Sequence, residues 1–309
     1  MPAFRFGVQL NAASSGRDWI QLTRRAEELG FSTFMVPDHF DSQLSPISAL
    51  AYAAATTNMI NLGPLVMSND YRHPLVLARE AATLASLSGG RLELGIGAGW
   101  MKSDYEQSGL LFDPPGRRIS RLVESIEVMK ALWDGGPVDY QGEFYSLAAA
   151  TSYPEVPLSE RPRLTIGGGG RRVLDVAARY ADVVGINPNL AAGKIGTDLL
   201  EEVTPDKFDE RVAHVKESLD KYGRAAELQC LTFMSAVVDD SKGWIESMST
   251  AVGVDPDVAS AVPIILYGSI EQIIDQIERR RERYGFSYWV VHQHEMESFA
   301  PVVGALTGR

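Results

Sequence analysis

Short apolar or β-branched runs alternate with helical patterns along the whole chain. Such alternation indicates right-handed βαβ units and therefore a parallel sheet. Eight of these runs within 309 residues predict a closed (β/α)8 TIM barrel, with a doubly wound open sheet as the alternative. The strands are expected at Phe4–Leu10, Phe31–Val36, Ile60–Met67, Arg91–Gly97, Arg163–Gly167, Asp182–Ile186, Leu228–Val238 and Phe286–Val291.

Three segments depart from the strand-helix order and predict insertions after strands four, six and seven. Val138–Leu147 has the pattern of a small hairpin, and Pro188–Val203 and Asp255–Pro263 have no clear period. No change of composition divides the chain, so residues 1–309 are expected to form one domain. The helix that begins after Ser269 is expected to open with a capping box, because Gln272 follows three residues later.

The composition argues against several kinds of partner. The chain has 29 Lys and Arg against 40 Asp and Glu, a formal net charge of −11, which disfavours nucleic acid and anionic membrane surfaces as main partners. The single cysteine, Cys230, allows no internal disulfide and favours a reducing compartment. Met1-Pro2-Ala3 leads directly into a strand pattern, and no apolar run reaches transmembrane length. A cytoplasmic location is therefore expected.

Asp38 and His39 follow the second strand directly, after Pro37 has ended it. The carboxyl ends of parallel strands are where ligands bind in barrels. Histidine is the side chain best suited to move a proton near neutral pH, and a neighbouring acid can hold its charge or tautomer. The alternative is an aspartate that caps a helix beside a surface histidine.

Polar side chains also follow the other strands, and a barrel would bring them together at one end. They are Gln9 and Asn11 after strand one, Ser68, Asn69 and Arg72 after strand three, Trp100 and Ser103 after strand four, Asn187 after strand six, and His292 and His294 after strand eight.

Four consecutive glycines, Gly167, Gly168, Gly169 and Gly170, separate the fifth strand from its helix. Glycines at this place let the backbone approach a phosphate, and the helix amides and dipole favour an anion there. Arg171 at the helix start is out of place for the dipole unless an anion is bound. The alternative is a flexible turn with a solvated arginine. Gly95-x-Gly97 lacks the third glycine of a dinucleotide-binding fingerprint.

The loop after strand four, Gly97-Ala98-Gly99-Trp100, has no bulky side chain before the tryptophan. A flat ring could lie against such a backbone, with Trp100 as a pocket wall; the alternative is a tight turn with a core tryptophan. His292-x-His294 offers two metal-ligand types, but no third matched ligand accompanies them, so no metal site is expected.

The stretches FSTFMVPDHF, LGPLVMSNDYRHPL, RLELGIGAGW and ARYADVVGIN, together with the glycine run and the closing ESFAPVV, resemble the luciferase-like superfamily of flavin and deazaflavin oxidoreductases. The likeness covers nearly the whole chain and is strongest to the branch that uses the deazaflavin coenzyme F420, with flavin mononucleotide (FMN) as the alternative cofactor. It implies a luciferase-like barrel, and relatives commonly pair as homodimers.

The resemblance also implies roles for particular residues. Asp38 and His39 would lie against the ring of the cofactor, with His39 as the proton donor or acceptor. A bulge after strand three, often with a non-proline cis peptide, would support the ring near Leu65 and Val66. The residues that would border the ring or hold the phosphate are Ala98, Gly99 and the Gly167–Gly170 turn with Arg171.

One position departs from the family pattern. Members that oxidise a sugar phosphate carry a glutamate after the small-residue loop, where this chain has Trp100. The resemblance therefore implies hydride transfer between the deazaflavin ring and another small organic substrate, through a C=C, C=N or alcohol/carbonyl group. The rivals are an FMN monooxygenase that uses reduced flavin and oxygen, and a binding protein that has lost catalysis. The expected substrate pocket comprises Asn11, Tyr71, Trp100, Ser103 and Trp289.

Overall fold

The computed structural model describes residues 2–194, 196 and 199–309. Its main sheet contains nine parallel strands in the order β3-β2-β1-β13-β10-β9-β8-β5-β4. β3 and β4 occupy one position in the wall, and a bridge from Leu62 to Leu92 joins that position to the next. The sheet thus curls into a nearly closed barrel, which confirms the predicted fold class and excludes the open sheet. The strands are β1 (Arg5–Gln9), β2 (Thr33–Val36), β3 (Asn61–Pro64), β4 (Met67–Ser68), β5 (Glu93–Gly97), β8 (Arg163–Gly168), β9 (Val183–Ile186), β10 (Glu227–Leu231) and β13 (Phe286–His292).

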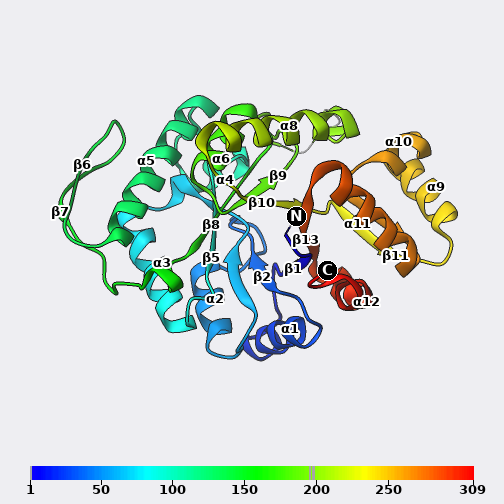
Figure 1. The fold of residues 1–309 in the computed structure, drawn as a ribbon, viewed down its shortest axis with the longest axis horizontal. Coiled ribbons are helices and arrows are strands. Elements are labelled where there is room, and N and C mark those ends of the chain that lie inside the picture. Colours follow the sequence, from blue (N-terminus) through cyan, green and yellow to red (C-terminus); the bar gives the residue numbers. More distant parts are fainter. Residues whose placement is uncertain (1, 195, 197–198) are drawn as a thin grey trace.

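Helices surround the outside of this ring (Figure 1). Their boundaries follow local sequence signals: Gly89 ends α3 and Gly223 ends α8 in the left-handed conformation, and the predicted capping box of Ser269 and Gln272 is present. The helices are α1 (Gly16–Glu28), α2 (Pro46–Ala54), α3 (Pro74–Ser88), α5 (Pro115–Asp134), α6 (Arg171–Tyr180), α8 (Pro205–Tyr222), α11 (Ile270–Tyr284) and α12 (Met296–Leu306).

The insertion after β5 contains the predicted hairpin, formed by β6 (Val138–Gln141) and β7 (Ser146–Ala150). The hairpin projects beyond α5 at the left of Figure 1. The same insertion also holds α4 (Lys102–Ser108), which was not predicted. A seven-residue helix gives too few turns for its periodicity to be recognised.

The predicted strand at Leu228–Val238 is wrong as one unit. The chain leaves the barrel at Thr232, whose amide donates to the carbonyl of Val290, and the amide of Phe233 then donates to Ile264. The next strand, β11 (Met234–Val237), pairs in parallel with β12 (Ile265–Gly268) in a separate two-stranded sheet. α9 (Ser241–Val252) lies between them in the sequence.

The segment Asp255–Pro263, expected to be irregular, contains α10 (Pro256–Ala261). Asp255 caps this helix by accepting a hydrogen bond from the amide of Asp257. The other expected excursion, Pro188–Val203, contains the short helix α7 (Leu199–Glu202). Its residues 195, 197 and 198 lie outside the described part of the chain.

Successive residues of the strands face opposite sides of the barrel wall. Phe6 and Phe34 belong to the large core between strands and helices. Met35, Tyr288 and Val290 form a separate buried cluster, which fills the interior of the ring.

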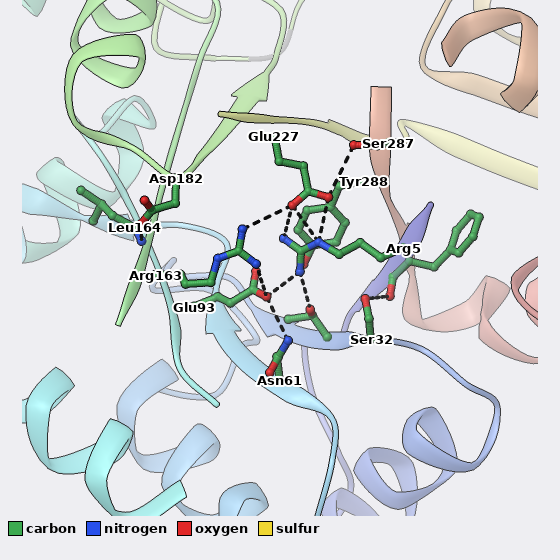
Figure 2. A network of polar contacts seen from close by, with 12 residues as sticks. Arg5, Ser32, Asn61, Glu93, Arg163, Leu164, Asp182, Glu227, Ser287 and Tyr288 are labelled. Carbon is green, nitrogen blue, oxygen red and sulfur yellow. Dashed lines mark hydrogen bonds and ion pairs between the residues drawn. The ribbon is translucent and has the colours of Figure 1, made fainter. Parts of the chain in front are cut away.

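A charged network forms the floor of the barrel (Figure 2). The Arg5 Nε donates to the carboxylate of Glu227 at 2.9 Å, and its Nη1 donates to Glu93 at 2.5 Å. The guanidinium also lies 3.6 Å from the ring centre of Tyr288. Burial alone would lower the pKa of Arg5, but Tyr288 and the two carboxylates raise it above its usual value. Arg5 therefore stays charged and links β1, β5 and β10 across the ring.

We predict that Arg5→Met destabilises the protein by about 3 kcal/mol, because two buried carboxylates then lose their nearest cation. They would keep only the longer contacts of Arg163, at 4.0 Å to Glu93 and 3.6 Å to Glu227. The free energy of urea-induced unfolding measures this change. Arg25→Met is the matched control, since it removes an exposed arginine-glutamate pair with Glu297, and exposed pairs contribute little. Equal effects of the two substitutions would contradict the role given to the floor network.

Candidate active site

Asp38 is a fully engaged structural carboxylate at the mouth of the barrel. Arg72 donates to it twice, from Nη1 at 2.6 Å and from Nη2 at 3.0 Å, and the amide of Ser68 donates to it at 3.0 Å. Asp38 is buried, so this bidentate pair ties the end of β2 to the segment after β4. The expectation that Asp38 holds the ring of His39 is wrong.

The partner of His39 is instead Asp104, in the first turn of α4. Its Oδ2 lies 2.7 Å from the imidazole Nδ1. The Tyr71 hydroxyl donates to the same oxygen at 3.1 Å. The side chain of Asp104 is only 4% exposed, whereas that of His39 is 21% exposed. The imidazole thus rests on a buried carboxylate and still reaches the surface of the mouth.

Tyr71 acts as a hydrogen-bond donor in this arrangement. Burial raises the pKa of Tyr71, and the negative charge of Asp104 raises it further. Its hydroxyl therefore keeps its proton at neutral pH. Tyr71 lies where the sequence places it, after strand three, but its polar atom is directed to Asp104.

Aromatic rings line the same part of the mouth. Trp100 meets the ring of His39 edge to face, with centroids 5.6 Å apart and planes at 84°. Phe40, which is 45% exposed, packs on Tyr71 at 4.8 Å. These contacts place His39 beside an apolar, partly open surface. Trp100 thus contacts His39, and its role as a pocket wall stays a prediction.

The neighbouring wall of the barrel lacks side-chain bulk. Gly99 has φ +74°, and a Cβ at this position would collide with the hydroxyl of Tyr105. A Cβ on Gly97 would lie 3.0 Å from Val66. Val66 follows the cis peptide bond to Leu65, and this confirms the predicted non-proline cis peptide. The strand-four loop and the cis segment thus lie against each other, with glycine required between them.

Behind this wall, Tyr105 is held by a second buried carboxylate. Its hydroxyl donates to Asp70 at 2.9 Å, and Arg121 pairs with Asp70 at 2.8 Å. Burial and the charge of Asp70 raise the pKa of Tyr105, so it also remains a donor. This contact fixes α4, and with it Asp104, against the segment after β4.

The glycine turn after β8 is held from behind by Arg211, a buried residue of α8. Its Nε donates to the carbonyl of Gly169 at 3.1 Å, and its Nη1 donates to the carbonyl of Glu202 at 2.6 Å. A Cβ on Gly169 would collide with the backbone of Pro188. Gly170 is the N-cap of α6, so the free amides of the first helical turn, which begins at Arg171, open beside the turn.

The remaining residues predicted for the substrate pocket, Asn11, Ser103 and Trp289, are not among the residues that contact His39 through a hydrogen bond or an aromatic ring. Asn11 and Ser103 are exposed, and Asn11 is joined to Gln293, whose side chain accepts from its amide at 3.2 Å. Trp289 is fully buried and packs on Phe286 in the core between strands and helices. Its prediction as part of the pocket is wrong, because Tyr288 and Val290, not Trp289, face the interior.

His292 and His294 do not assemble into a metal site. The His292 Nε2 is 2.9 Å from the carbonyl of Thr232, and Glu295 accepts from the amides of His292 and Ser235. Within residues 2–194, 196 and 199–309, no group of three or more metal-ligating side chains is found. No helix of these residues is both long and apolar enough to cross a membrane.

The family model described as luciferase-like monooxygenase matches residues 2–243. This chain belongs to the luciferase-like monooxygenase family. A family relative, the F420-dependent glucose-6-phosphate dehydrogenase of Rhodococcus hoagii (strain 103S), is 33% identical over 80% of this chain and 75% of its own length. The enzyme of the same name from Kribbella flavida is 29% identical over 96% of this chain and 95% of its own.

The same luciferase-like fold is found in a solved structure, the coenzyme F420-dependent tetrahydromethanopterin reductase from Methanopyrus kandleri. It superposes with a TM-score of 0.79 at 22% identity and covers 99% of this chain and 100% of that one. At this identity the likeness shows the fold alone.

We predict that Gly99→Ala is more destabilising than Gly109→Ala. Both glycines have positive φ, +74° and +71°, but a Cβ on Gly109 meets no atom within 4 Å. Gly109→Ala should cost about 1–2 kcal/mol for the left-handed backbone, and Gly99→Ala about 1–3 kcal/mol more for overpacking. Urea unfolding of both variants gives the comparison. Equal losses would show that the space at Gly99 is not restricted by Tyr105.

Proposed function

We propose that this protein is a deazaflavin-dependent oxidoreductase that uses coenzyme F420. It would transfer a hydride between the deazaflavin ring and a small organic substrate through a C=C, C=N or alcohol/carbonyl group. The observation that carries the proposal is His39, a histidine backed by a buried carboxylate and placed beside a wall without side-chain bulk at the barrel mouth. Family membership and the names of the two dehydrogenase relatives support the choice of coenzyme.

The residues at the mouth fit a flat ring attached to a phosphate. Gly97 and Gly99 pack directly on Val66 and Tyr105, so this part of the wall consists of backbone, and Leu65, Val66 and Ala98 are only partly buried beside it. The turn at Gly168–Gly170 offers the amides and dipole of α6 to an anion. Asp38 contributes by holding the ends of β2 and β4 together. When bound, the coenzyme supplies or accepts the hydride.

His39 would give or take the proton that accompanies hydride transfer. Its Nδ1 is engaged by Asp104, so Nε2 is the atom left for a substrate. A positioned histidine contributes typically 10²–10⁴-fold to such a step. The aromatic rings of Trp100, Phe40 and Tyr71 would orient an apolar substrate and exclude water around it.

The proposed substrate class follows from the position of Trp100 beside His39. Trp100 presents an indole beside His39, and an indole offers a negatively charged group no ion pair. A sugar phosphate is therefore not the proposed substrate. An uncharged molecule with an apolar body and one reducible or oxidisable group fits the aromatic surface better.

The proposal is tested by titrating the purified protein with coenzyme F420 and, separately, with FMN, following ring fluorescence. We expect saturable micromolar binding of the deazaflavin and much weaker binding of FMN. Preferential binding of reduced FMN would instead favour a flavin monooxygenase, and oxygen consumption coupled to product formation would support that activity. Failure of both to bind would overturn the proposed function.

The phosphate site has its own prediction. Gly169→Ala should raise the Kd for coenzyme F420 at least tenfold, about 1.4 kcal/mol, because the new Cβ pushes the turn away from Pro188. Gly304→Ala is the control: Gly304 lies on α12, outside the turn, and a Cβ there meets no atom within 4 Å, so the Kd should stay the same. The thermal unfolding midpoint of both variants separates loss of binding from loss of folding. A normal Kd for Gly169→Ala would argue against phosphate binding at this turn.

A further inference from the structure

The acidic side chains near the barrel mouth divide into two kinds by their partners. Asp38 is paired with Arg72, and Asp70 and Asp113 are both paired with Arg121. Asp104 has no arginine or lysine among its ion pairs with the described residues; its one ionisable basic partner is His39. A carboxylate that is buried without a cation is costly. The imidazole of His39 is therefore the group that has to compensate the buried carboxylate of Asp104.

We infer that Asp104 is the positioning residue of His39: it fixes the neutral imidazole as the tautomer with its proton on Nδ1 and leaves Nε2 as the atom that exchanges a proton. The inference deepens the proposed function and rests on it for the claim that Nε2 exchanges a proton with a substrate. The tautomer of His39 does not depend on that function and can be measured in the protein alone.

The hydrogen-bond directions lead to this tautomer. The ionised carboxylate of Asp104 only accepts hydrogen bonds. Because the pKa of Tyr71 is raised by burial and by Asp104, the hydroxyl of Tyr71 donates to Oδ2. The imidazole Nδ1, 2.7 Å from the same oxygen, must then carry a proton as well. A neutral imidazole with Nδ1 protonated has its lone pair on Nε2.

The element that carries Asp104 is held in place on both sides. Tyr105, the next residue, donates to Asp70, and the amide of Lys102 donates to the carbonyl of Gly193 at 3.0 Å. The amide of Phe40 faces the other oxygen of Asp104 at 3.5 Å. A carboxylate fixed in this way sets the orientation of the ring as well as its tautomer. When His39 becomes positively charged in the reaction, the same carboxylate stabilises that charge.

The test uses the coenzyme-free full chain labelled with ¹⁵N, in which long-range ¹H–¹⁵N spectra distinguish protonated from unprotonated ring nitrogens. His39→Gln identifies the signals of His39 among those of the five histidines. Spectra are taken at high enough pH for the ring to be neutral. We expect His39 to have a protonated Nδ1 and an unprotonated Nε2. A native protein with the proton on Nε2 would overturn the inference without any variant.

Asp104→Leu removes the acceptor while keeping a side chain of similar size, so His39 should change to the tautomer with the proton on Nε2. Tyr71→Phe keeps Asp104 and should leave the tautomer on Nδ1. Asp113→Asn is the matched control, another buried acid on the same side of the barrel, and should leave the His39 signals in place. An unchanged tautomer in folded Asp104→Leu, or its loss in Tyr71→Phe, would overturn the role of Asp104.

The same samples are then titrated with coenzyme F420. We expect the Kd of Asp104→Leu to lie within about twofold of the native value, since Asp104 is buried behind the imidazole. A Kd raised more than tenfold would mean that Asp104 shapes the coenzyme site as a whole and would overturn a role confined to His39. If the native protein has the expected tautomer but binds no coenzyme, the proposed function fails while the pairing of Asp104 with His39 stands.

Discussion

The ion pairs that Arg5 makes with Glu93 and Glu227 close one end of the barrel interior, and the arrangement of the other end depends on this. They join three wall strands, β1, β5 and β10, at their amino ends, across the interior of the ring. Tyr288 and Met35 fill the space above them. The charged network and these two side chains fill the interior of the barrel near the amino ends of the strands. Nearer the carboxyl ends, the wall has glycine at Gly95, Gly97, Gly167 and Gly185. These wall positions near the carboxyl ends of the strands thus carry no side chains.

Asp38 and Asp104 both lie at the mouth of the barrel but have different partners. The residues next to them in the sequence do not indicate which partner each has. Asp38 adjoins His39 in sequence but is neutralised by Arg72. Asp104, sixty-five residues after His39, reaches the imidazole. The difference lies in direction: the chain turns after Pro37 so that Asp38 points toward β4, while the ring of His39 points toward α4. Asp38 thus has a structural role as the partner of Arg72, and Asp104 is the carboxylate beside the imidazole of His39.

The sequence was informative mainly where the signal was local, although the local Asp255-Pro256 start of α10 was missed. Helix ends at Gly89 and Gly223, the capping box at Ser269 and the glycine turn after β8 all depend on a few neighbouring residues. The position of the cis peptide at Leu65 came from the resemblance alone. Strand Phe286–His292 is apolar on both faces, so periodicity could not say that Trp289 faces the helices. Asp104 lies on a helix too short to be recognised. The chain leaves the barrel after Thr232, where the amide of Phe233 bonds to the distant carbonyl of Ile264 instead of continuing along β13.

Arg211 joins two parts of the mouth that are separate in the sequence. One guanidinium holds the carbonyl of Gly169 in the turn after β8 and both the carbonyl and the carboxylate of Glu202, and that carboxylate also accepts from the amide of Asn189. The turn and the segment that follows β9 therefore share one set of hydrogen bonds. By thermodynamic linkage, any ligand that stabilised the turn would also stabilise this neighbouring segment, and the segment would strengthen its binding by the same factor. A single buried side chain therefore connects the backbone of the turn to the segment that follows β9.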